Sequence, residues 1–396
     1  MLGWEEHLDK VRDSRPRALI PTSAVVRATV VMFLARLGSL NALEQSRPSR
    51  FWPKWVGREL PSADTIGRVC ALVEPTEVRD LHQQMYTRLK RGKALEPPAH
   101  GLTAAILDAH ESHATRRRHC SGCLARTIHT RQGDVIEYYH RSVTLQLVTR
   151  DLCPMLDAEP IRPGEDEIAA AVRLLERVVA RYPRAFDVIL GDSLYADSRV
   201  FNLALKHHKH AMAVLKENRH ALLEEATLLL DQSPTVCWQE AGVRYECAEV
   251  EGITTWSTVQ APVRAIRSRE TWFVRRQLDK KSEEQHGQWI WVTTLGQRSA
   301  GTAATVRLGH RRWVIENLGF NEIATRWFAD HVYRHDSTAM LNFWLLAMAC
   351  LNLFMAFYAR NLKPAARRAA SMLHISRLIL AELYHAIPTA LIRASP

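Results

Sequence analysis

Residues 186–197, FDVILGDSLYAD, decide the fold because they begin with a short apolar run, typical of a buried strand, that ends at an acid. The stretch before it, Glu165 to Tyr182, has apolar residues at i, i+3, i+4 and i+7, the spacing of an amphipathic helix. After it, DSRVFNLALKHH (197–208) predicts a helix and AMAVLK (211–216) predicts a short strand. Strands that alternate with helices indicate a mixed sheet with helices on its faces.

An earlier strand pattern, LTAAILDAH (102–110), also ends in an acid, Asp108, as VILG ends in Asp192. Functional groups of α/β sheets gather at strand ends. Two carboxylates from neighbouring strands suit Mg²⁺, which takes hard oxygen ligands and keeps waters and substrate phosphates. An Asp after a strand is also a common turn or cap residue, and we expect that role for Asp187 and Asp197.

A third acid, Glu316, lies in the predicted helix GHRRWVIENLGFNE, four residues after Arg312 and therefore on the same face. In such a pair Glu can hold a metal while Arg meets a phosphate; the alternative is an ordinary surface ion pair. The neighbours Trp313, Ile315 and Phe320 predict a partly buried helix. A buried Glu needs a partner or a metal.

The chain of 396 residues is basic, with 53 Lys and Arg against 42 Asp and Glu and a formal net charge of +11. Its 47% apolar and 24% charged residues predict a globular protein with a substantial core. The basic excess favours a polyanionic partner, nucleic acid first. Arg predominates in the clusters at 116–118, 311–312 and 367–368, and guanidinium groups match phosphate oxygens.

Seven Cys scattered over a long chain do not form a disulfide framework, and they fit a reducing cytoplasm. The first 17 residues are charged and lack an apolar signal core, so a cytoplasmic protein is expected. The segment Ala339 to Tyr358 resembles a membrane span but carries Asn342 and Asn352. We expect it to be a buried helix, and we expect no membrane partner.

The motif HCSGC (119–123) places Cys120 and Cys123 at the spacing of a zinc knuckle. The sequence shows no second pair of ligands, so a tight turn with two thiols is expected rather than structural zinc. Three polar residues that closely follow the first acid are candidates to contact metal or DNA: His110, Glu111 and His113.

The pattern divides the chain into five segments. Residues 1–98 are helical and basic, either a DNA-binding module or a helical support, and 99–215 form the first part of a mixed core. Residues 216–298 are rich in Val, Thr, Trp and Tyr, which predicts a β-rich insertion. The second part of the core, with the Glu-bearing helix, spans 299–360, and a helical basic tail spans 361–396.

In this order the chain resembles the insertion-sequence DDE transposases, whose ribonuclease H-like core is interrupted by a β-rich domain. The resemblance covers roughly residues 60–358. Its most specific pieces are LDAHES (107–112), FDVILGDSLYAD, WVTTLG (291–296) and RRWVIENLGFNE (311–322). It implies a ribonuclease H-like mixed sheet flanked by helices, with helical N- and C-terminal regions.

The family's third motif reads Tyr-x2-Arg-x3-Glu-x6-Lys, and Arg312 and Glu316 match it. Gly309 stands at the Tyr position and Ile323 at the Lys position. Arg326, one helical turn further, is the residue that can replace the Lys. These departures leave the acidic trio intact and affect the groups that clamp phosphate.

The resemblance implies DNA cleavage and strand transfer with two Mg²⁺ (or Mn²⁺) ions in each active site. Asp108 would bridge both ions, and Asp192 and Glu316 would each complete one site. Metals and positioning then carry the reaction, with little acid–base help from side chains. The side chains expected to contact DNA are Arg311, Arg312 and Arg326.

The implied partner is double-stranded DNA, both terminal inverted repeats and target DNA, bound by a homodimer. One Trp of the insertion is expected to stack a flipped base, although most of the five belong to the β-domain core: Trp238, Trp256, Trp272, Trp289 and Trp291. Two alternatives remain open: a DNA-binding protein of the same fold with impaired catalysis, and another metal-dependent nuclease with this core.

Overall fold

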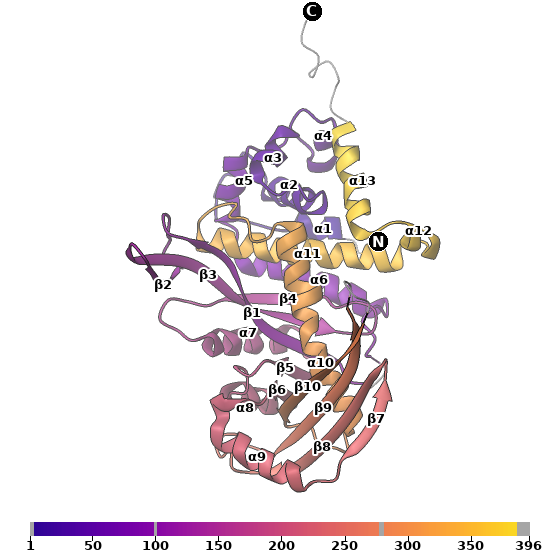
Figure 1. Ribbon diagram of the computed structural model, residues 1–396. Coiled ribbons are helices and arrows are strands. Elements are labelled where there is room, and N and C mark those ends of the chain that lie inside the picture. The colour runs from indigo at the N-terminus through magenta and orange to yellow at the C-terminus, as the bar shows by residue number, and fades with distance from the viewer. Residues whose placement is uncertain (1–3, 99–100, 277–280, 386–396) are drawn as a thin grey trace, which may run out of the picture. The chain divides into compact units, whose positions relative to one another are not determined.

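The strands form one mixed sheet in the order β2-β3-β1-β5-β6-β10-β9-β8-β7, and β4 also pairs with β3 (Figure 1). The computed structural model describes residues 4–98, 101–276 and 281–385. The chain forms two compact units: unit 1 is Met1–Glu96, Ala109–Ala170 and Glu316–Pro396, and unit 2 is Pro97–Asp108 and Ala171–Ile315. The expected mixed sheet flanked by helices is confirmed.

The elements of unit 1 are α1 (Trp4–Leu8), α2 (Thr22–Leu34), α3 (Leu40–Gln45), α4 (Phe51–Val56), α5 (Ala63–Cys70), α6 (Pro75–Arg91), β2 (Leu124–Thr130), β3 (Gly133–Val148), β4 (Met155–Pro160), α11 (Ser337–Arg360), α12 (Pro364–Ala369) and α13 (Met372–His385). Three elements contain residues of both units: β1 (Ala104–Thr115), α7 (Glu167–Arg181) and the π-helix η3 (Ile315–Arg326).

The elements of unit 2 are β5 (Val188–Gly191), α8 (Ser198–Lys206), β6 (His210–Val214), the 3-10 turn η1 (Glu217–Arg219), α9 (His220–Gln232), β7 (Val236–Glu240), β8 (Val243–Ile253), β9 (Val263–Arg275), β10 (Ser282–Thr293), α10 (Thr302–His310) and the 3-10 turn η2 (Arg311–Trp313).

Helix α11 forms the centre of unit 1 and packs against α2, α5, α6 and β4. It is the one described helix long and apolar enough to cross a membrane, and 72% of its most apolar window is buried. Asn342 Nδ2 donates to Cys70 O (2.8 Å) and Val73 O (2.7 Å). Asn352 Nδ2 donates to Met155 O (2.6 Å). These amides satisfy backbone carbonyls inside the core, which favours the core helix of a soluble protein.

The strands of the predicted β-rich insertion continue the sheet of unit 2. Strand β10 pairs antiparallel with β6, with Trp291 opposite Val214, and β9, β8 and β7 follow as antiparallel neighbours. Helix α9 packs on β8 and β9, and α8 packs on β6 (Figure 1). The insertion is therefore anchored to the core sheet through backbone hydrogen bonds.

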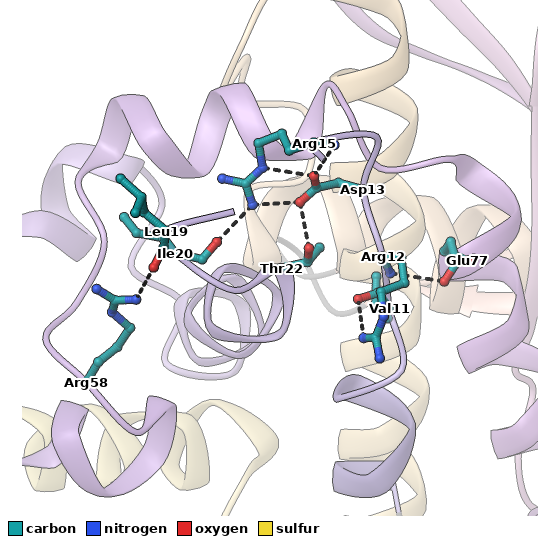
Figure 2. Close-up of polar contacts among 9 residues, drawn as sticks. All are labelled: Val11, Arg12, Asp13, Arg15, Leu19, Ile20, Thr22, Arg58 and Glu77. Carbon is teal, nitrogen blue, oxygen red and sulfur yellow. Dashed lines mark hydrogen bonds and ion pairs between the residues drawn. The ribbon is translucent and has the colours of Figure 1, made fainter. Parts of the chain in front are cut away.

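Asp13 ties the segment before α2 to the start of that helix (Figure 2). Its side chain is 1% exposed and accepts hydrogen bonds from Arg15 Nη2 and Thr22 Oγ1, both at 2.6 Å. Arg15 Nη2 also donates to Ile20 O at 2.9 Å. Hydrogen bonds from Arg15 hold the pKa of Asp13 near 2, below its ordinary value of 3.8, with a further contribution from Thr22.

Replacing this carboxylate should make the stability of the chain less dependent on acid pH. Because the folded-state pKa is lowered, the stabilisation is present above pH 3.8 and is lost as pH falls through about 2. We expect Asp13→Asn to lower the free energy of unfolding by about 2 kcal/mol at pH 7. Urea titrations at several pH values would measure it. The exposed Asp9→Asn is the control, and equal losses in both variants would contradict the prediction.

Candidate active site

Asp108 lies on β1, and Asp192 directly follows β5, the parallel neighbour of β1. Strands β1 and β5 pair with Ala104 opposite Val188 and Ile106 opposite Leu190. If the chain kept this register for two more residues, Asp108 would lie opposite Asp192, which directly follows β5. Adjacent strands lie about 4.8 Å apart, and both acids are half-buried. Within unit 2, the pairing therefore brings two of the predicted site residues together.

The prediction that the first strand ends at its acid is wrong. β1 extends from Ala104 to Thr115, so Asp108 is its fifth residue. Burial falls from complete at Leu107 to partial at Asp108 and beyond. The apolar run marks the buried part of the strand, and the polar residues after it continue the strand at a more exposed part of the sheet.

The loop after β5 is shaped by Gly191. A Cβ at this position would lie 2.4 Å from Cβ of Tyr195, whose side chain is 1% exposed. Only glycine allows this ring to pack against the end of the strand. Asp192 Oδ1 accepts a hydrogen bond from Leu194 N at 2.8 Å. These contacts hold the Asp192 carboxylate in a defined direction.

The two alternative acids have the structural roles predicted for them. Asp187 Oδ2 accepts a hydrogen bond from Thr103 N at 2.8 Å, at the opposite end of β5 from Asp192. Asp197 is the N-cap of α8 and accepts a hydrogen bond from Arg199 N at 2.9 Å.

Arg312 supplies positive charge beside the first acid. Its Nη1 lies 3.7 Å from Asp108 Oδ2, with side chains 13% and 18% exposed respectively. The guanidinium also lies 5.2 Å from the centroid of the Trp313 ring. Both residues, with the half-buried Arg311, belong to η2. A partly desolvated guanidinium at this position can pair with a carboxylate or with a phosphate.

Trp291 of β10 occupies the space that a side chain at position 309 would need. A Cβ at Gly309 would lie 2.6 Å from Trp291 Cε2 and 2.9 Å from Met212 Cε. Trp291 is 2% exposed, so it cannot move aside without opening the core. A side chain at position 309 is therefore excluded by Trp291.

The aromatic cluster around Trp291 joins the insertion to the end of α10. Trp289 lies 6.3 Å from Trp291 and 4.8 Å from Trp313, and His310 stacks on Trp313 at 5.4 Å. His310 Nε2 lies 2.7 Å from Oε1 of the buried Glu270. These tryptophans have packing partners within unit 2, and base stacking by any of them stays a prediction.

The expected partly buried helix is confirmed, since Ile315 and Phe320 are buried, but Glu316 itself is exposed. It lies in the first turn of η3, a π-helix rather than the expected α-helix. A π-helix has i→i+5 hydrogen bonds. Its side chains therefore point in directions that differ from those expected for an α-helix. The prediction that Glu316 acts with the two aspartates stays a prediction.

The residues at and after the missing lysine have structural partners in unit 1. Ile323 is fully buried. The Arg326 side chain is 58% exposed, and its Nη1 lies 3.1 Å from Glu322 Oε2. Glu322 Oε1 also lies 3.2 Å from Nη2 of the buried Arg36. Arg326 thus reaches solvent while its charge is partly balanced.

His110 and Glu111, which follow Asp108 in the chain, belong to unit 1 and form contacts with other residues of that unit. His110 Nε2 lies 2.8 Å from Asp330 Oδ1, and its ring stacks on Trp344 at 5.3 Å. Both carboxylate oxygens of Glu111 accept hydrogen bonds from Arg126 at 2.8 Å. The role expected for these residues with metal or DNA stays untested.

A four-residue cluster in unit 1 was missed by the sequence reasoning. Cys120, Cys123, His140 and His335 place one sulfur or nitrogen each within 4.8 Å of the others. Burial, together with His335 and His113, lowers the pKa of His140 to about 4, so this imidazole is neutral at pH 7. The Cys-x2-Cys spacing was the visible signal, but neither histidine is near it in a recognisable pattern.

Comparison with known protein families and with curated proteins found no family and no relative that match this chain.

The packing of Trp291 on Gly309 predicts the effect of a single methyl group. We expect Gly309→Ala to lower the free energy of unfolding by about 1–3 kcal/mol, because a tightly packed core does not accept the extra carbon. Gly309→Tyr, which restores the family residue, should destabilise at least as much.

Denaturant unfolding measures both variants. The control is Gly296→Ala, where the nearest atom to the new Cβ is 3.5 Å away and the change should stay within about 0.5 kcal/mol. If Gly309→Ala is as stable as the wild type, Trp291 does not fill this space.

Proposed function

We propose that the chain is a DDE-type DNA transposase, which cleaves the ends of its element and joins them to target DNA by phosphoryl transfer. The observation that carries the proposal is the parallel pairing of β1 with β5, because Asp108 lies on β1 and Asp192 directly follows β5. Strands β7–β10 separate Asp192 from Glu316 along the chain, the order of elements in the family that the sequence resembles. The same resemblance supports a ribonuclease H-like assignment of the sheet.

The two aspartates fit a hard divalent cation. Both are half-buried carboxylates on adjacent strands, and Mg²⁺ is held in phosphoryl-transfer sites by one or two carboxylates with waters and phosphates. Asp108 and Asp192 would hold the Mg²⁺ or Mn²⁺ ions, and the resemblance adds Glu316. Bound ions would activate the attacking hydroxyl and stabilise the leaving oxygen.

The protein's own part in the reaction is to hold and orient. The hydrogen bond from Leu194 N fixes the direction of Asp192, and Arg312 lies 3.7 Å from Asp108. A phosphate that approaches the two acids would meet this guanidinium. Trp313 restricts the conformations of Arg312 by contact with its ring, which lowers the entropy lost on binding.

Exposed arginines support binding to double-stranded DNA. Arg116, Arg117 and Arg118 form an exposed run between β1 and β2, and the net charge is +11. Such clusters neutralise phosphates and release counterions. Together with Arg311, Arg312 and Arg326 they are the proposed DNA contacts. A homodimer that bridges two terminal repeats is part of the proposal.

One observation favours a second function, DNA binding without cleavage. The tyrosine of the third motif is replaced by Gly309, whose space Trp291 occupies, and the lysine by the buried Ile323. Two phosphate contacts of the family are therefore lost in a way that neighbouring side chains cannot easily reverse.

A cleavage assay separates the two functions. Purified protein is incubated with Mg²⁺ and a duplex that carries the inverted repeat flanking the reading frame. We expect strand cleavage by the wild type and a loss of at least about 100-fold in Asp192→Asn and Asp108→Asn, because metal stabilisation is worth several kcal/mol. DNA affinity in a mobility-shift assay should stay close to that of the wild type.

Asp187→Asn is the matched control, since it lies at the other end of the same strand and an amide oxygen can still accept from Thr103 N. It should cleave like the wild type. A wild type that binds the repeat but cuts in neither Mg²⁺ nor Mn²⁺ would leave the non-cleaving DNA-binding protein. Cleavage of unrelated duplexes at equal rates would indicate a general nuclease.

A further inference from the structure

Two thiols and two imidazoles converge in unit 1. The Sγ atoms of Cys120 and Cys123 lie 3.8 Å apart. His140 Nε2 lies 3.4 Å from the first sulfur and 3.2 Å from the second, and His335 Nε2 lies 3.3 Å from Cys123 Sγ. The four ligand atoms thus surround one point.

These four separations are close to the edges of a tetrahedral zinc site, and the remaining two, from His335 to Cys120 and to His140, lie within 4.8 Å. Zn–S bonds of about 2.3 Å and Zn–N bonds of about 2.0–2.1 Å give S···S edges of about 3.8 Å and S···N edges of about 3.5 Å. The thiols are not joined to each other, since a disulfide bond is about 2.05 Å long. Two soft sulfurs with two imidazoles select Zn²⁺ over Mg²⁺ or Ca²⁺.

The β2–β3 hairpin builds three of the four positions. Its antiparallel register sets Leu124 opposite Tyr139, and one more step sets Cys123 opposite His140. Cys120 is placed by a turn in which Cys123 N donates to Cys120 O at 3.1 Å. In the same turn, Cys120 N donates to Cys123 Sγ at 3.2 Å. A backbone N–H aimed at a sulfur stabilises the thiolate form that a metal requires.

The fourth position comes from the segment before α11. His335 directly precedes Asp336, the N-cap of that helix. A Cβ at Gly122 would lie 2.8 Å from Ser337 Cβ, so glycine allows the thiol turn to approach the start of α11. The close approach of the two segments therefore requires a residue without a side chain at position 122.

We propose that the chain binds one structural Zn²⁺ through Cys120, Cys123, His140 and His335. All four positions of a tetrahedron are filled by protein, so the site is closed and non-catalytic. The ion joins the β2–β3 hairpin to the start of α11, two segments about two hundred residues apart in sequence. The arginine run 116–118 lies directly before the thiol turn and is anchored with it.

The test measures metal on the full chain without DNA, so it is independent of the proposed catalysis. Protein is purified with no added metal, dialysed, and analysed for zinc by mass spectrometry. We expect one zinc per chain, and X-ray absorption should show two sulfur and two nitrogen neighbours. After chelation, Co²⁺ should restore a visible spectrum with thiolate charge transfer and tetrahedral d–d bands.

Cys123→Ser and His335→Ala should each weaken zinc affinity by more than about 100-fold, beyond the loss typical of residues that only orient a ligand. His113→Ala, whose ring lies 5.7 Å from His335, and Cys237→Ser, an exposed thiol, should keep the zinc. If the ligand variants fail to fold, the wild-type absorption spectra decide. A chain without zinc, an oxygen-dominated shell, or a Cys120–Cys123 disulfide in freshly purified protein would each overturn the proposal.

Discussion

The parallel pairing of β1 with β5 is the constraint on which the rest of unit 2 depends. It orders the sheet, because β6 then pairs parallel with β5 and β10 extends the sheet from β6. The pairing also decides which functional groups can meet, because a parallel register places equivalent positions of two strands at the same level. The pairing brings the strand of Asp108 beside the strand that Asp192 directly follows, although the two acids are 84 positions apart in the chain.

The position of these acids is supported by residues with no chemistry of their own. Gly191 admits the ring of Tyr195, and Gly309 admits the indole of Trp291. In each case the missing side chain of a glycine is the space that a buried aromatic ring occupies. The second contact shows that β10 and α10 pack so closely that position 309 has no room for a side chain.

The proposed zinc site and the proposed magnesium site follow opposite rules of coordination. The acids on β1 and β5 offer hard oxygens and retain room for phosphates, as a catalytic site requires. The cluster on the β2–β3 hairpin offers soft ligands on all sides and retains no position for a substrate. The two proposals therefore assign to the chain two kinds of metal site that do not compete, one for chemistry and one for the hairpin.

The sequence by itself determined the elements whose pattern is local. It predicted helix α7, strands β5 and β6, the strand character of β7–β10, the burial of α11, and the cap or turn roles of Asp187 and Asp197. Periodicity, capping and burial of apolar runs depend on neighbours within a few residues, so they can be read directly.

Only the tertiary structure decided what lies together across long separations. It showed that β1 continues past Asp108, that Glu316 is exposed in a π-helix, and that Trp291 excludes a side chain at Gly309. It also brought His140 and His335 to the two thiols. Sheet register and loop approach are set by packing between distant segments, and no local pattern of residues encodes which distant side chain will fill a given space.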